Sequence, residues 1–165
     1  MRDPLEHGAH WGALAFLGLA TATAAIAGAS ASVQAADFYQ ELSKPPWAPP
    51  AQVFGPVWSV LYVLMAVGAW LVVRAWGWQR ARPAIALYLV QLALNGLWPW
   101  LFFGWRLGAL ALVEILVLWT VLLLTVGTFF RVRRLAGVLM LPYLAWVTVA
   151  TALTYAVWRR NLGVL

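Results

Sequence analysis

Residues 53–73, VFGPVWSVLYVLMAVGAWLVV, carry no charged side chain. A helix needs about 20 mainly apolar residues to cross the hydrocarbon core of a bilayer, and this stretch is long enough. Similar runs lie on both sides of it. The segments that we expect to span the membrane are 9–33, 53–73, 81–103, 107–130 and 135–158. The sequence therefore predicts an all-α membrane protein, built as a bundle of five transmembrane helices.

The composition of the chain supports a single membrane domain over residues 1–165. Hydrophobic residues make up 64% of the sequence and charged residues 10%, against about 45–50% and about 25% in soluble domains. A water-soluble monomer could not bury so much apolar surface. We expect an integral, multi-pass membrane protein of bacterial origin, with the lipid bilayer as its main partner.

The net charge of +6 could suggest binding to nucleic acid. The basic residues, however, stand at the ends of the expected helices, where they anchor against lipid headgroups. We therefore expect no nucleic-acid partner. The chain has no cysteine, which excludes disulfides and thiolate metal sites, and we expect no metal site.

The first apolar run has an alternative interpretation as a cleaved secretory signal, because the small residues ASASVQAAD follow its core. The leader MRDPLEH is not basic, since Arg2 is outweighed by Asp3 and Glu6. The run is also long enough to span a bilayer. We expect it to be retained as the first membrane helix.

The third run places Gln91, Asn95, Trp98 and Phe102 at spacings of four, three and four, along one face of a helix. Amides are costly in hydrocarbon unless they are hydrogen-bonded, so this face should point into the bundle. Pro99 lacks an N–H and leaves the carbonyl of Asn95 without its helical donor. The stripe fits either a ligand site or polar links between helices, and taken alone it favours neither.

Two further helices carry aromatic stripes at helical spacing. In the second run these residues are Phe54, Trp58, Tyr62 and Met65, and in the fifth they are Tyr143, Trp146, Ala150 and Thr154. Any one stripe is explained by ordinary packing. If the three stripes converge, they enclose a cavity with flat aromatic walls and a few amides, which suits a planar, mostly apolar ligand.

Glu114 is the acidic residue that lies well within an expected span. Ionisable groups at such depth are candidates for a function, here a proton-linked or ligand-facing role. The alternative is a buried structural acid bonded to a neighbouring helix. No basic residue lies at a matching depth, and the sequence favours the structural interpretation.

Five segments carry a resemblance to a known family. They are FYQELSKPPWAPP, VFGPVWSVLY, QLALNGLWPWLFFG, LPYLAW and YAVWRRN. In this order they resemble the tryptophan-rich sensory protein family, whose animal member is the mitochondrial translocator protein, or peripheral benzodiazepine receptor. The resemblance covers about residues 38–161, and the first helix matches only in character.

The resemblance implies a five-helix membrane bundle, commonly a homodimer, that binds porphyrins such as protoporphyrin IX and haem. Several members also bind sterols and benzodiazepine-type ligands. A porphyrin or haem would be the ligand, and no cofactor is required. By similarity, the pocket residues are Trp47, Trp58, Asn95, Trp98, Trp146 and Ala150, and Glu114 falls where the family commonly has an acid. A sterol-recognition pattern matches Leu153, Tyr155 and Arg159, although it is a weak pattern with many chance matches.

The long connection at residues 34–52 contains paired prolines at 45–46 and 49–50. These prolines fix φ and favour an extended, semi-rigid path. We expect this segment to be a lid loop that holds Trp47 over the mouth of the bundle.

The function that we expect is binding of porphyrin-type tetrapyrroles, in their transport or in a regulatory response to them. One alternative is light-dependent degradation of porphyrin through the pocket tryptophans. A second alternative is a membrane scaffold for partner proteins. Transport and sensing both need only reversible binding, and the sequence does not separate them.

Overall fold

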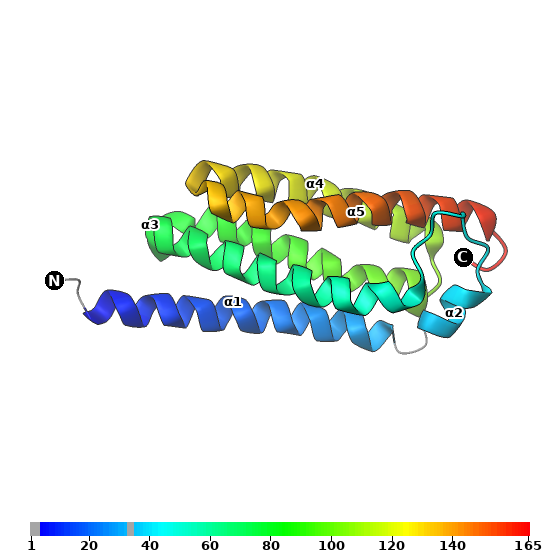
Figure 1. The fold of residues 1–165 in the computed structure, drawn as a ribbon, viewed down its shortest axis with the longest axis horizontal. Coiled ribbons are helices and arrows are strands. Elements are labelled where there is room, and N and C mark those ends of the chain that lie inside the picture. The colour runs from blue at the N-terminus through cyan, green and yellow to red at the C-terminus, as the bar shows by residue number, and fades with distance from the viewer. Residues whose placement is uncertain (1–3, 33–34) are drawn as a thin grey trace.

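The computed structural model describes residues 4–32 and 35–165, with the side chains of 4–10 and 36 excepted. This part of the chain is folded into helices joined by short turns (Figure 1). In chain order the elements are α1 (Pro4–Ala31), α2 (Ala35–Glu41), the 3-10 turn η1 (Ala51–Val53), α3 (Phe54–Pro99), the π-helical turn η2 (Trp100–Gly104), α4 (Gly108–Val132) and α5 (Arg134–Arg160). The predicted all-α class is confirmed.

Helix α3 is a hairpin of two membrane-spanning arms. Its 46 residues are interrupted at Gly77, where φ is 71° and ψ is 160°. The hydroxyl of Tyr62 nevertheless lies 2.7 Å from Oδ1 of Asn95, whereas a straight helix would place these residues about 50 Å apart. The chain therefore reverses at Gly77, as Figure 1 shows. The two arms, together with α1, α4 and α5, make the predicted five-helix bundle.

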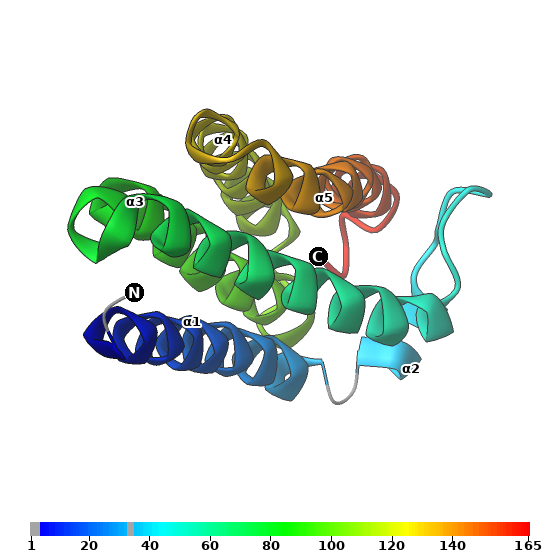
Figure 2. The same cartoon turned by 60° about the vertical axis from the view of Figure 1, so that its left-hand side comes forward.

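The hairpin of α3 lies between α1 on one side and the α4–α5 pair on the other (Figures 1 and 2). Thr21 of α1 and Tyr88 of α3 share a hydrogen bond of 2.6 Å between their hydroxyls. The ring of Tyr88 in turn stacks on Phe129 of α4, with 6.2 Å between centroids. Helix α1 is thus an integral part of the bundle, as expected for a retained first helix.

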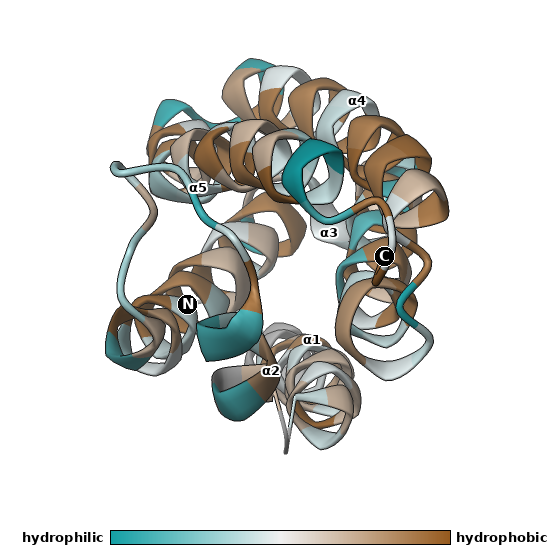
Figure 3. Cartoon of the chain, turned by 90° about the vertical axis from the view of Figure 1, so that its right-hand side faces the viewer, coloured by the Kyte–Doolittle hydropathy of each residue, from teal (hydrophilic) through white to brown (hydrophobic). Residues whose placement is uncertain are grey.

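The outer surface of the bundle is apolar. Large aliphatic side chains such as Val60, Val113 and Leu124 are more than half exposed, and Figure 3 shows that α4 consists mainly of hydrophobic residues. In water such a surface would be strongly unfavourable, but lipid tails solvate it at no cost. The helices are long and apolar enough to cross a membrane. The chain is therefore a multi-pass integral membrane protein.

The connection expected as a lid loop is more structured than the sequence suggested. Residues 35–53, called the cap segment below, include α2 and η1 at either end of the proline-rich stretch. Phe38 of α2 and Leu42, which directly follows α2, are buried in a hydrophobic cluster with Phe102 and Leu153. Burial of one apolar face stabilises a helix that is too short to persist alone. Elsewhere the difference is one of length, since α1 begins at Pro4 rather than at residue 9.

We expect Gly77→Ala to destabilise the protein, because the backbone conformation at Gly77 is open almost only to glycine and costs other residues about 1–3 kcal/mol. Gly127→Ala is the matched control. Gly127 lies within α4 with open space around its Cα, so alanine there should be neutral or slightly stabilising. Thermal unfolding in detergent should show a lower midpoint for Gly77→Ala alone. Equal midpoints would show that Gly77 does not define the reversal.

Candidate ligand-binding site

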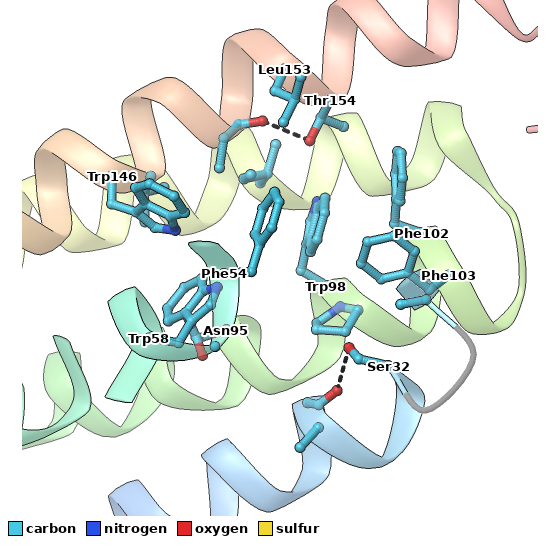
Figure 4. Close-up of a pocket in the computed structure, with 18 of the residues that line it drawn as sticks. Ser32, Phe54, Trp58, Asn95, Trp98, Phe102, Phe103, Trp146, Leu153 and Thr154 are labelled. Atoms are coloured by element: carbon cyan, nitrogen blue, oxygen red, sulfur yellow. Dashed lines mark hydrogen bonds between the residues drawn. The ribbon is translucent and has the colours of Figure 1, made fainter. Parts of the chain in front are cut away.

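A cavity of about 530 Å³ lies in the half of the bundle next to the cap segment (Figure 4). Its walls come from α1, α2, both arms of α3, η2, α4 and α5. No charged side chain is among the described residues that line it. The residues singled out from the sequence that line it are Phe54, Trp58, Tyr62, Asn95, Trp98, Phe102, Trp146, Ala150, Leu153 and Thr154. The three aromatic stripes therefore do converge.

The aromatic rings around the cavity support one another. Trp98 stacks on Phe102, with 5.0 Å between centroids and 14° between ring planes. Phe54 meets Trp146 edge to face at 5.8 Å. Such pairs contribute about 0.5–1.5 kcal/mol beyond the burial of their area. The walls are therefore apolar, and contacts between the rings help to hold them in place.

The π-helical turn η2 brings two neighbouring phenylalanines to one cavity. Pro99 cannot donate to the carbonyl of Asn95, so regular α-helical bonding fails here. The chain continues with a wider turn, in which the N–H of Trp105 donates to the carbonyl of Trp100 at 2.7 Å. Phe102 and Phe103 of this turn both line the cavity. Pro99 therefore marks the point where the regular helix gives way to a turn that contributes to the cavity wall.

A chain of hydrogen bonds closes the inner end of the cavity. The hydroxyl of Tyr62 donates to Oδ1 of Asn95 at 2.7 Å, and Nδ2 of Asn95 donates to the hydroxyl of Tyr143 at 2.9 Å. This chain links both arms of α3 to α5. The Asn95 side-chain amide has two N–H groups, and the second one is available for a further hydrogen bond. The site can therefore offer a ligand an amide donor in an otherwise apolar wall.

Two indole groups add further donors. The Nε1 atoms of Trp98 and Trp146 are buried and have no hydrogen-bond partner among the described residues. A buried donor without a partner costs about 1–3 kcal/mol. A ligand with acceptor oxygens could recover part of this energy after a small ring movement.

Three of the expected polar residues lie behind the cavity wall. Gln91 and Tyr143 are fully buried and do not line it. Glu114 is buried beside the lining residue Ile115, and neither of its carboxyl oxygens has a partner in the described part of the chain. Within residues 4–32 and 35–165, Glu114 therefore lacks the expected bond to a neighbouring helix, and both polar atoms of the Gln91 amide are likewise unpaired there.

Trp47 does not line the cavity and is 52% exposed. The N–H of Ala48 donates to the carbonyl of Pro45 at 3.0 Å. This closes a tight turn that directs Trp47 outward. From the same connection, Tyr39 of α2 does line the cavity, and sequence reasoning missed it.

The three residues of the sterol-recognition pattern do not share one surface. Leu153 is buried and lines the cavity, whereas Tyr155 and Arg159 are exposed on the outside of α5. Leu153 and Tyr155 are two residues apart and point to opposite sides of the helix, whereas Tyr155 and Arg159 are four apart and share one face. The structure therefore brings only Leu153 to the cavity.

Sequence reasoning also missed the contribution of α1. Small residues near the end of α1 line the cavity, namely Ala25, Gly28, Ala29 and Ser32. The run of small side chains was the available signal, because it allows close approach between helices. A Cβ at Gly28 would lie 3.4 Å from Cγ of Pro99, which is an ordinary van der Waals distance and shows that α1 packs directly against Pro99 there.

The fold and cavity define a class of protein: a polytopic helical membrane protein with an internal cavity walled by aromatic side chains. The family model that matches this chain is the TspO/MBR family, over residues 15–159. The chain belongs to this family.

Similar proteins come from animals and bacteria. The translocator protein of Homo sapiens is 43% identical over 128 residues, covering 76% of each chain. The tryptophan-rich sensory protein of Cereibacter sphaeroides is 39% identical over 146 residues, covering 88% of this chain and 90% of the relative. Protein CrtK of Rhodobacter capsulatus is 39% identical over 127 residues, covering 76% and 79%. The bacterial relatives support a bacterial origin.

We expect Tyr143→Phe to lower the thermal unfolding midpoint, because it leaves an N–H of Asn95 without an acceptor at a cost of about 1–3 kcal/mol. Tyr155→Phe removes a hydroxyl from a side chain that is 53% exposed and should change little. The two variants are compared by thermal unfolding in the same detergent. A Tyr143→Phe midpoint equal to that of Tyr155→Phe would contradict the structural importance of the chain.

Proposed function

We propose that this protein binds a porphyrin-type tetrapyrrole in the cavity and takes part in its transport or sensing. The observation that carries the proposal is an apolar cavity of about 530 Å³, walled by Trp58, Trp98 and Trp146 and closed by the amide of Asn95. Ligand sites are typically about 300–1,000 Å³ and mostly apolar, with few polar groups. The cavity fits that description.

The chemistry of the walls favours a planar aromatic ligand that carries acceptor oxygens. A porphyrin ring can stack against indole and phenyl faces, which are already arranged as flat surfaces. Its carboxylates can accept hydrogen bonds from the free N–H of Asn95 and the unpaired indole of Trp146. A sterol has fewer acceptors and no π face, so we place it second.

The names of the relatives agree with reversible binding. One is called a translocator and another a sensory protein, and both activities require a ligand that enters and leaves unchanged. Binding by stacking and a few hydrogen bonds provides such reversibility. Neither activity requires a chemical step in the cavity.

Titration of the purified full chain with protoporphyrin IX should quench tryptophan fluorescence saturably. Ala150→Phe should weaken binding at least tenfold, because the added ring fills part of the cavity. Val149→Phe is the matched control, since Val149 is 43% exposed on the outer surface. It should bind as the wild type does. Absence of saturable quenching in both detergent and lipid would refute the proposal.

The same titration separates binding from the light-dependent alternative when it is run in darkness and under visible light. Reversible binding predicts a porphyrin absorption spectrum that is recovered in full after dilution or extraction from the dark sample. Bleaching under light that Ala150→Phe abolishes and Val149→Phe preserves would favour degradation instead.

A further inference from the structure

The cap segment is joined to the end of α5 by one side-chain amide. Oδ1 of Asn161 accepts a hydrogen bond from the backbone N–H of Ser43 at 2.9 Å. Nδ2 of Asn161 donates to the carbonyl of the same residue, also at 2.9 Å. Both backbone polar groups of Ser43 are thus satisfied by a residue 118 positions away. Among the natural amino acids, only an amide side chain can donate and accept in this way.

The orientation of Asn161 is fixed from its own helix. Nδ2 also donates to the carbonyl of Val157 at 2.7 Å, so both of its hydrogens are used. Val157 lines the cavity and belongs to the hydrophobic cluster that contains Phe38 of α2 and the next residue after that helix, Leu42. The amide pair and the packing of α2 therefore occur on the same side of the bundle.

The segment held by Asn161 forms part of the cavity wall. Tyr39 lines the cavity and packs edge to face on Phe54, with 5.6 Å between ring centroids. Lys44 ties the end of α2 to the following turn, because its ammonium contacts the carbonyls of Tyr39 and Leu42. Tyr39 is therefore connected to Ser43 through the neighbouring Lys44, and its own hydroxyl donates to the carbonyl of Pro49 at 3.1 Å.

A second contact holds the other side of α2. The guanidinium of Arg106 lies over the ring of Phe38, 4.5 Å from its centroid. Arg106 has a φ of 55°, a left-handed conformation that is uncommon for arginine. It is a weaker attachment than a pair of hydrogen bonds to backbone, since exposed cation–π contacts contribute little.

We propose that Asn161 is a positioning residue for the ligand site: its amide latches the cap segment closed through Ser43, and this latch sets how fast ligand enters and leaves. The inference rests on the proposed function of the cavity. Asn161 does not itself line the cavity. It acts through Ser43, Lys44 and Tyr39, and it changes the barrier to exchange more than the affinity.

The first test needs no ligand. Hydrogen–deuterium exchange of the purified full chain should show faster exchange over residues 42–48 in Asn161→Ala than in the wild type, by about tenfold for the loss of these bonds. Arg160→Ala is the matched control, because Arg160 bonds within α5 to Ala156. It should leave the cap segment unchanged. Equal exchange in Asn161→Ala and Arg160→Ala would overturn the latch.

The second test uses the absence of cysteine from the chain. A Ser43→Cys, Asn161→Cys double variant replaces the amide pair with a link that a reductant can break. Stopped-flow mixing with protoporphyrin IX should give association and dissociation rates about tenfold faster than wild type when reduced. When oxidised, both rates should be slower than wild type. Identical rates in the two redox states, with disulfide formation verified by mass spectrometry, would overturn the proposal.

The split between rates and affinity separates positioning from a merely structural role. A latch predicts that both rates rise in Asn161→Ala while Kd changes less than threefold. A loss of affinity with an unchanged association rate would indicate a damaged cavity and count against the latch. If the wild type binds no protoporphyrin IX, the proposed function fails, while the exchange experiment without ligand still decides on the latch.

Discussion

The structure depends on one constraint: inside a bilayer, no water is present to satisfy a polar group. The described backbone obeys it by being helical over most of its length, and it departs from helix at Gly77 and in the turns at either end of the bundle. The side chains obey the same rule at Asn95, whose amide joins Tyr62 and Tyr143 across three helical segments. The polar group that closes the cavity therefore also links both arms of α3 to α5.

The two halves of the bundle are packed differently. Toward Gly77, residues such as Met65, Tyr88 and Met140 fill the interior completely. Toward the cap segment, the large rings lie against the helices as walls and leave about 530 Å³ between them. Pro99 marks the change, because it interrupts regular bonding and leads into the wider π turn. At this end of the bundle, the cap segment and its hydrophobic cluster cover the cavity.

The spacing of residues along each helix predicted most of the fold and much of the site. Apolar runs predicted the spans, and helical periodicity placed Trp58, Asn95 and Trp146 on faces that meet. Periodicity shows which face of a helix a residue lies on, but not how far along the helix the cavity extends. It could not show that Gln91, one turn before Asn95, lies outside the cavity. Nor could it show that a π turn brings in Phe103 or that a proline turn directs Trp47 outward. These features depend on local departures from regular helix geometry and on how the helices align with one another. The residue spacing within one helix does not contain that information.

The hairpin of α3 has a consequence for biogenesis. Tyr62 and Asn95 lie in arms that follow one another in the chain, so Asn95 gains a partner as soon as the hairpin has been inserted. Tyr143 belongs to α5 and joins when the last helix is made. The Asn95 amide therefore has a hydrogen-bond partner in lipid before α5 has been made. The order of synthesis, from α3 to α5, matches the order in which the hydrogen-bond chain can be completed.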